Sequence, residues 1–192
     1  MNNRSSGKVK IQGYVCPWWM ISTFDNPLRR LMQKPEVILG GLIPPGGRCL
    51  DIGCGFGYYT LGMAELAGIG GHVTAVDIQQ KMIDGTKRRV RKRGLTDRVD
   101  FHLSNASTLD MEGGFDFALA FWMMHEVKDQ AGFATNVYNL LKHGGHFLLV
   151  EPKIHVNKPS FLHSVDLLVN AGFVMAGTRN VFFSRSQVFR KE

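Results

Sequence analysis

Short apolar runs alternate along the chain with longer stretches in which apolar residues recur at helical spacing. The short runs predict strands at residues 48–52, 72–78, 99–103, 115–121 and 146–151. Strands that are apolar along most of their length are typical of parallel strands covered on both faces of a sheet.

The stretches between these runs predict amphipathic helices. In residues 128–142 apolar positions recur at i, i+4, i+7 and i+8, and residues 160–171 repeat this pattern. We expect Gly144 with Gly145, and Gly172, to end these helices. Alternating strands and helices predict an α/β fold with an open, doubly wound, mostly parallel sheet.

The two ends of the chain follow different patterns. Asn26 and Pro27 predict the start of a helix that Pro35 interrupts, and a second short helix is expected to stop at Gly40 with Gly41. Residues 173–192 predict two final strands joined by a short turn, the last one antiparallel to the rest of the sheet.

Composition narrows the class of protein. The 192 residues are 44% hydrophobic and 20% charged, which suits one globular domain. Cys16, Cys49 and Cys54 have no paired spacing, so we expect no disulfide framework and a reducing, cytoplasmic setting. We expect no signal peptide and no membrane span, because the longest apolar run, residues 117–124, is far shorter than about 18 residues.

The net charge of +7 is largely local. Residues 81–98 contain eight Lys and Arg residues and two Asp residues, on one predicted helix and its end. Two interpretations remain open. The cations form a solvated helix face, or they form an electrostatic landing site for RNA or an anionic membrane.

A glycine-rich loop follows the first predicted strand. Dinucleotide-binding loops read G-x-G-x-x-G, and here Gly57 comes one position too early after Gly53 and Gly55. Asp51 would repel a pyrophosphate but suits the cationic methionine part of S-adenosylmethionine. Asp77 ends the second strand and can accept both hydroxyls of a ribose, which NAD would also need. A tight turn without a ligand, with Asp77 as a helix cap, is the alternative.

Five segments together resemble the class I S-adenosylmethionine-dependent methyltransferases, over the chain from residue 26 onward. They are LDIGCGFGYYTLGMAE, VTAVDIQQKMID, LSNASTLD, FDFALAFWMMHEVKD and LLKHGGHFLLVEPK. The MMHEV run resembles the branch of ubiquinone/menaquinone-type and arsenite-type enzymes that act on small molecules. Arsenite methylation would need clustered thiols, and only Cys16 lies outside the first strand and the glycine loop.

The resemblance implies a Rossmann-like fold with a seven-stranded sheet and an N-terminal helical flap. It implies one methyltransferase domain over residues 1–192, divided into a lid at 1–44 and a core at 45–192. The segment before Asn26 is rich in aromatic residues and predicts a lid that excludes water, with a helix packed on the sheet edge or a dimer contact as the alternative. Its residues are Tyr14, Cys16, Trp18, Trp19 and Phe24.

The resemblance also implies the cofactor, S-adenosyl-L-methionine, and its product, S-adenosyl-L-homocysteine. With the strand order 3-2-1-4-5 of the family, the cofactor would cover the ends of the first and second strands and the methyl acceptor those of the fourth and fifth. The residues expected to bind the cofactor are Asp51, Gly53, Cys54, Gly55, Gly57, Asp77, Ile78, Met82, Asn105, Ala106, Phe121 and Trp122.

Two residues are candidates for catalysis. His125 follows the fourth strand and could take a proton from the acceptor, because an imidazole titrates near pH 6.5. Glu151 ends the fifth strand, and His155 follows it closely. A hydrogen-bonding role in the loop is the alternative for His125 and Glu151. No spacing of ligand types matches a metal site. His143 and His146 are expected to be turn residues at the opposite end of the sheet.

We therefore expect a methyltransferase that transfers a methyl group to a small molecule by an in-line SN2 reaction, in a monomer or homodimer. A methyltransferase for RNA or protein, suggested by the basic helix, is one alternative, although a nucleic-acid partner is not expected. A SAM-binding protein without catalysis is another, and the glycine spacing makes a dehydrogenase the weakest.

Overall fold

The computed structural model describes residues 32–104 and 109–192. Its seven strands form one sheet in the order β3-β2-β1-β4-β5-β7-β6. The strands are β1 (Arg48–Ile52), β2 (His72–Asp77), β3 (Val99–Leu103), β4 (Phe115–Phe121), β5 (Leu141–Pro152), β6 (Phe173–Met175) and β7 (Ser184–Lys191). The helices are α3 (Pro35–Leu39), α4 (Tyr58–Ala67), α5 (Gln80–Lys92), α6 (Gln130–Leu140) and α7 (Lys158–Asn170), with 3-10 turns η1 (Thr96–Arg98) and η2 (Met124–Glu126).

Strand pairing confirms the predicted fold class. Strands β1 to β5 pair in parallel, and β7 pairs antiparallel with both β5 and β6. The result is a doubly wound, mostly parallel, seven-stranded sheet whose last strand is antiparallel.

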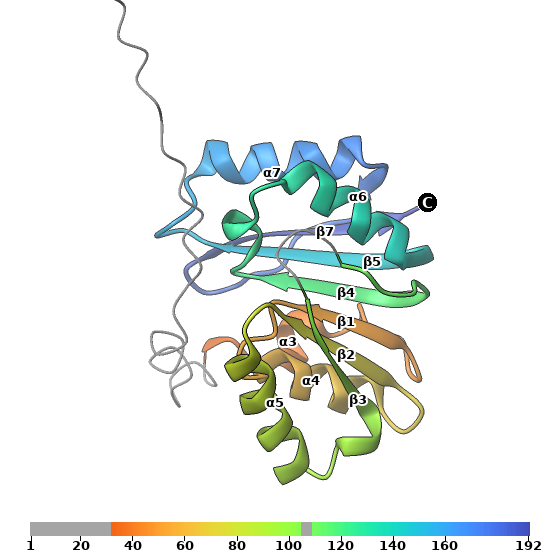
Figure 1. Ribbon diagram of the computed structural model, residues 1–192. Coiled ribbons are helices and arrows are strands. Elements are labelled where there is room, and N and C mark those ends of the chain that lie inside the picture. The colour runs from red at the N-terminus through yellow and green to blue at the C-terminus, as the bar shows by residue number, and fades with distance from the viewer. Residues whose placement is uncertain (1–31, 105–108) are drawn as a thin grey trace, which may run out of the picture.

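Helices cover both faces of the sheet, as Figure 1 shows. Helices α3, α4 and α5 pack against one face, where Phe117 and Leu119 of β4 are buried, and α6 and α7 pack against the other, where Ala118 and Ala120 are buried. Because both faces of the central strands are covered, these strands are apolar throughout rather than alternating.

The start of β5 corrects one prediction. The helix predicted over residues 128–142 ends at Leu140, and Gly144 with Gly145 lies inside β5 instead of ending the helix. Leu141 pairs with Phe115, and the register then shifts between Phe115 and Phe117. A Cβ on Gly145 would lie 2.9 Å from the carbonyl oxygen of Lys142, so this glycine permits the irregular backbone of the strand.

The same change moves two histidines. His143 and His146 were expected in a turn, but both belong to β5, and His146 pairs with Phe117 and Arg190. Burial and the charges of Arg190 and Arg179 lower the pKa of His146. Both residues lie in the first half of β5, away from Glu151 near its end.

The N-terminal predictions are tested only in part. The expected second short helix is α3, with Pro35 in its first turn and Gly40 at its end. The helix expected after Asn26 and the aromatic segment from Tyr14 to Phe24 lie outside the described residues. Across residues 32–104 and 109–192, no helix is both long and apolar enough to span a membrane.

Candidate functional site

The parallel strands bring the candidate residues to one edge of the sheet. Strands β1, β2, β4 and β5 run in the same direction, so the loops that follow them leave from the same edge. The glycine loop follows β1 and Asp77 ends β2, while Trp122 and His125 follow β4 and Glu151 lies near the end of β5.

Hydrogen bonds connect the glycine loop to the end of β2. The amides of Gly53 and Cys54 both donate to the carbonyl oxygen of Val76, at 2.8 and 2.9 Å. The amide of Gly55 donates to Oδ2 of Asp77 at 3.0 Å. These bonds hold the loop across the ends of β1 and β2, so its shape is fixed by the protein alone.

Two of the loop glycines have no room for a side chain. Gly53 and Gly57 have φ angles of 73° and 78°, in the left-handed region that glycine tolerates best. A Cβ on Gly57 would lie 2.6 Å from Cγ2 of Thr86, and one on Gly53 would lie 2.9 Å from Cγ of Met123. The loop therefore needs glycine for both conformation and close approach.

Asp77 is a buried carboxylate between two backbone donors. Its Oδ2 accepts from Gly55, and its Oδ1 accepts from the amide of Gln79 at 2.9 Å. Burial raises the pKa of Asp77, against the lowering effect of these hydrogen bonds. Each carboxylate oxygen can accept more than one hydrogen bond, so the loop contacts are compatible with a ligand hydroxyl on either oxygen.

Asp51 is an almost fully buried carboxylate beneath the glycine loop. It is 2% exposed, and its Oδ2 accepts a hydrogen bond of 2.5 Å from Thr60 in the first turn of α4. The carboxylate is thus oriented from beneath the glycine loop. Sequence analysis missed Thr60, although a polar residue on the buried side of a helix was an available signal.

The other residues expected to bind the cofactor differ in exposure. Cys54 is buried, and burial raises the pKa of its thiol well above the ordinary value, which makes it a packing residue rather than a nucleophile. Met82 lies fully within the core, whereas Ile78 is 41% exposed. Asn105 and Ala106 lie outside the described residues.

Phe121 and Trp122 form an aromatic surface between the part of this edge that carries the glycine loop and the part that carries His125 and Glu151. The Phe121 ring packs 4.3 Å from that of Tyr59 and 5.2 Å from that of Trp122. Trp122 has a φ of 61°, which is unusual for a residue other than glycine. Its indole donates to Oγ of Ser184 at 2.9 Å, so β7 fixes the orientation of this ring.

His125 and Glu151 form a hydrogen-bonded pair. Oε2 of Glu151 lies 2.5 Å from Nδ1 of His125, and Oε1 accepts from the His125 amide at 3.0 Å. Burial would lower the pKa of His125, but the hydrogen bond and charge of Glu151, with the charge of Glu126, raise it. Because a carboxylate accepts, Nδ1 carries the proton and Nε2 is the nitrogen that can take another.

His155 lies beside the His125–Glu151 pair. Its ring stacks on that of His125 with centroids 6.1 Å apart and planes 14° apart. Among the residues the structure describes, no three His, Cys, Asp or Glu side chains are grouped as metal ligands.

Several cationic side chains of the basic helix make contacts within the protein. Arg93 pairs with Glu65, Arg89 donates to the carbonyl oxygen of Phe56, and Lys87 lies over the ring of Phe101. These contacts favour the interpretation as a solvated helix face.

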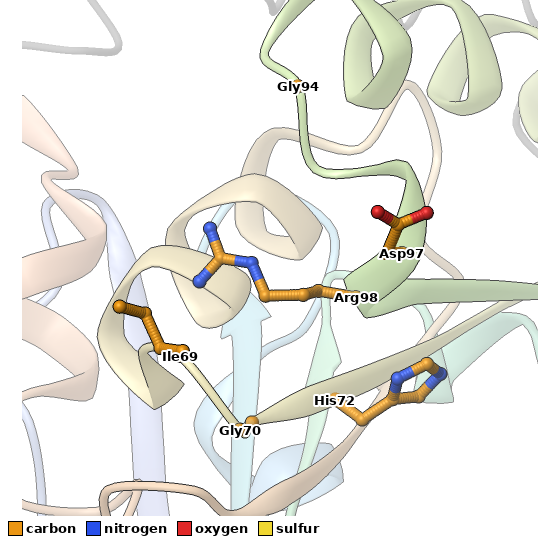
Figure 2. Close-up of a pocket in the computed structure, with 7 residues that line it drawn as sticks. Ile69, Gly70, His72, Gly94, Asp97 and Arg98 are labelled. Carbon is orange, nitrogen blue, oxygen red and sulfur yellow. The ribbon is translucent and has the colours of Figure 1, made fainter.

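A pocket of about 450 Å³ lies at the opposite edge, where β2 begins (Figure 2). Arg98 points into the turn that follows α4 and donates to the carbonyl oxygens of Ala64 and Gly68. His72 pairs with Asp100 at 2.7 Å. Because Arg98 and His72 are engaged in these contacts and the pocket lies away from the glycine loop, this pocket is a poor candidate for catalysis.

Comparison with known proteins identifies the family of the chain. A family model described as a methyltransferase domain matches residues 43–178. A ubiquinone biosynthesis O-methyltransferase of Xanthomonas axonopodis pv. citri is 30% identical over 135 residues, which cover 69% of this chain and 54% of the relative. An S-adenosyl-L-methionine-dependent Diels-Alderase of Talaromyces variabilis is 29% identical over 175 residues, covering 86% of this chain and 56% of the relative.

The chain thus spans about half the length of the curated relatives it matches. Among solved structures, a SAM-dependent methyltransferase from Aquifex aeolicus matches with a TM-score of 0.79 and 23% identity, over 90% of this chain and 97% of that chain. This likeness confirms the Rossmann-like fold.

Proposed function

Since this chain belongs to the methyltransferase domain family, whose model matches residues 43–178, we propose that it transfers the methyl group of S-adenosyl-L-methionine to a small-molecule acceptor. The proposal rests on two groups of residues that lie at the same edge of the sheet. One is the glycine loop with Asp77, and the other is His125 with Glu151.

The residues present fit this cofactor. The glycine loop leaves no room for side chains at Gly53 and Gly57, and Asp77 offers a carboxylate suited to ribose hydroxyls. Asp51 would contribute negative charge that favours the cationic sulfonium, and Phe121 with Trp122 would contribute apolar surface. When bound, S-adenosylmethionine provides an electrophilic methyl group on a sulfonium.

The step that the protein's own side chains perform is removal of a proton from the methyl acceptor. Nε2 of His125 takes the proton that the acceptor loses as its nucleophilic atom attacks, and Glu151 stabilises the resulting imidazolium. An acceptor hydroxyl suits this arrangement, because its oxygen becomes a strong nucleophile only when the proton leaves. Positioning of the two reactants supplies much of the remaining rate.

The assay that tests this proposal measures S-adenosylhomocysteine release with a panel of phenols, catechols and amines. We expect release that depends on the acceptor and falls by about a hundredfold or more in His125→Ala. One relative is named as a SAM-dependent Diels-Alderase, so the absence of methyl transfer would also be an informative result. Binding of S-adenosylmethionine without release for any acceptor would favour a protein that binds SAM without methyl transfer.

Further parts of the proposal concern the whole chain. We include the lid formed by residues 1–44 on a single domain, cytoplasmic localisation, and a monomer or homodimer. The free, buried thiols of Cys49 and Cys54 support a reducing compartment. The internal contacts of Arg89 and Arg93 argue against the alternative of an RNA substrate.

A further inference from the structure

Three large apolar side chains remain exposed at the edge that holds His125 and Glu151. Ile154 is 84% exposed, Phe182 is 47% exposed and Phe183 is 67% exposed. We call these three residues the apolar patch. They come from the loop after β5 and the loop before β7, which reach out from the same side of the sheet in Figure 1.

Hydrogen bonds hold the two loops together. The amide of Lys153 donates to the carbonyl oxygen of Phe183 at 2.9 Å. The carbonyl oxygen of Phe182 accepts from Nε2 of Gln33 at 3.3 Å and from Oγ of Ser184 at 3.2 Å. The patch is therefore a fixed surface feature rather than a loose loop tip.

The conformation of Phe183 is strained. Its φ is 53°, a region that a bulky residue adopts only when its surroundings enforce it. Its ring packs edge-on against that of Phe182, with centroids 4.5 Å apart. The strain keeps a large aromatic ring in solvent, and strained residues of this kind cluster at binding sites.

The loops that carry the patch contain only positive charges, although Glu151 and Glu126 lie nearby beside His125. Residues 153–158 and 176–185 contain four Lys and Arg residues and no Asp or Glu. Arg179 and Arg185 donate to carbonyl oxygens, of Gly40 and Val156. Lys153 and Lys158 are exposed; Lys153 adjoins Ile154 in the chain, and Lys158 begins α7 after the same loop. An anionic partner is thus favoured over a neutral one.

We propose that this edge docks on a bilayer that contains anionic phospholipids. The apolar patch would enter the headgroup region, and Lys153 and Lys158 would meet lipid phosphates. Exposed aromatic and aliphatic side chains beside exposed cations are the pattern of interfacial membrane association. The docking would turn the His125–Glu151 pair toward the lipid surface, and it does not depend on the proposed methyl transfer.

The test is sedimentation of the protein with vesicles of phosphatidylcholine alone or with roughly 30% phosphatidylglycerol. We expect binding to the anionic vesicles only. The double variant Ile154→Ser with Phe183→Asn should lower the partition coefficient by about tenfold or more. Asparagine tolerates the left-handed conformation, and the thermal unfolding midpoint confirms that each variant folds.

Matched controls come from elsewhere on the surface. Ile69→Ser removes an apolar side chain that is 97% exposed at the opposite edge, and it should leave binding unchanged. Lys153→Glu with Lys158→Glu should abolish binding, whereas Arg88→Glu with Arg91→Glu on α5 should not. The proposal is overturned if the protein binds neither vesicle, if neutral vesicles bind equally, or if the controls lose as much binding as the patch variants.

Discussion

Glu151 holds His125 through both the imidazole and the backbone amide, so neither the ring nor its segment can turn independently. Residue type and position at the ends of two predicted strands made His125 and Glu151 candidates, but their pairing across 26 positions depends on the fold. The same is true of Asp51 with Thr60 and of the indole of Trp122. Sequence patterns identify chemically capable side chains, whereas their partners follow from the topology.

The pH dependence of the reaction tests the His125–Glu151 pair. Because the neutral imidazole takes the proton, kcat/KM should rise with pH through the pKa of His125, which Glu151 raises above its ordinary value. In Glu151→Gln burial is opposed only by the smaller effect of the Glu126 charge, so this limb should move to lower pH. The maximal rate should fall by about tenfold to a hundredfold, because the base is weaker.

Glu126→Gln is the matched control for this prediction. It removes a nearby charge that contributes less to the pKa of His125, so its pH profile should shift little. A profile that stays in place in Glu151→Gln, or that moves equally in both variants, would contradict general-base catalysis by His125.

At the scale of elements, the local pattern of apolar residues predicted the bounds of most parallel strands. The apolar runs placed β1, β3 and β4 correctly, and β2 ends one residue earlier than expected. The start of β5 was missed because the helical spacing of apolar residues continues through Leu141. Leu141 belongs to the strand because it pairs with Phe115, a contact that no local pattern reveals.

The close approach of the glycine loop to α5 gives a prediction at this scale. Gly57→Ala forces a Cβ against Thr86 in addition to a strained φ, and it should cost about 2–4 kcal/mol of unfolding free energy. Gly94→Ala is the matched control, since its φ is 66° but nothing lies within 4 Å of the added Cβ. It should cost only about 1 kcal/mol.

Chemical denaturation measures both free energies. Titration with S-adenosylhomocysteine should also show weaker binding for Gly57→Ala, because the loop must shift away from Thr86. Equal destabilisation by the two alanines would mean that the backbone conformation alone, and not the contact between loop and helix, requires glycine at position 57.

At the scale of the whole molecule, strand order determines where chemistry occurs. Placing β1 between β2 and β4 puts the glycine loop and Asp77 on one side of the edge and His125 with Glu151 on the other. The sequence predicted this order through family resemblance rather than through periodicity. The lid over the edge remains a prediction, because its aromatic segment lies outside the described residues.

The central claim is that this edge binds S-adenosylmethionine, and calorimetric titration with S-adenosylhomocysteine tests it most directly. We expect binding with a dissociation constant on the order of micromolar, no binding of NADH, and at least about a tenfold loss of affinity in Asp77→Ala. Binding of NADH instead, or an affinity for S-adenosylhomocysteine that Asp77→Ala leaves unchanged, would contradict the account.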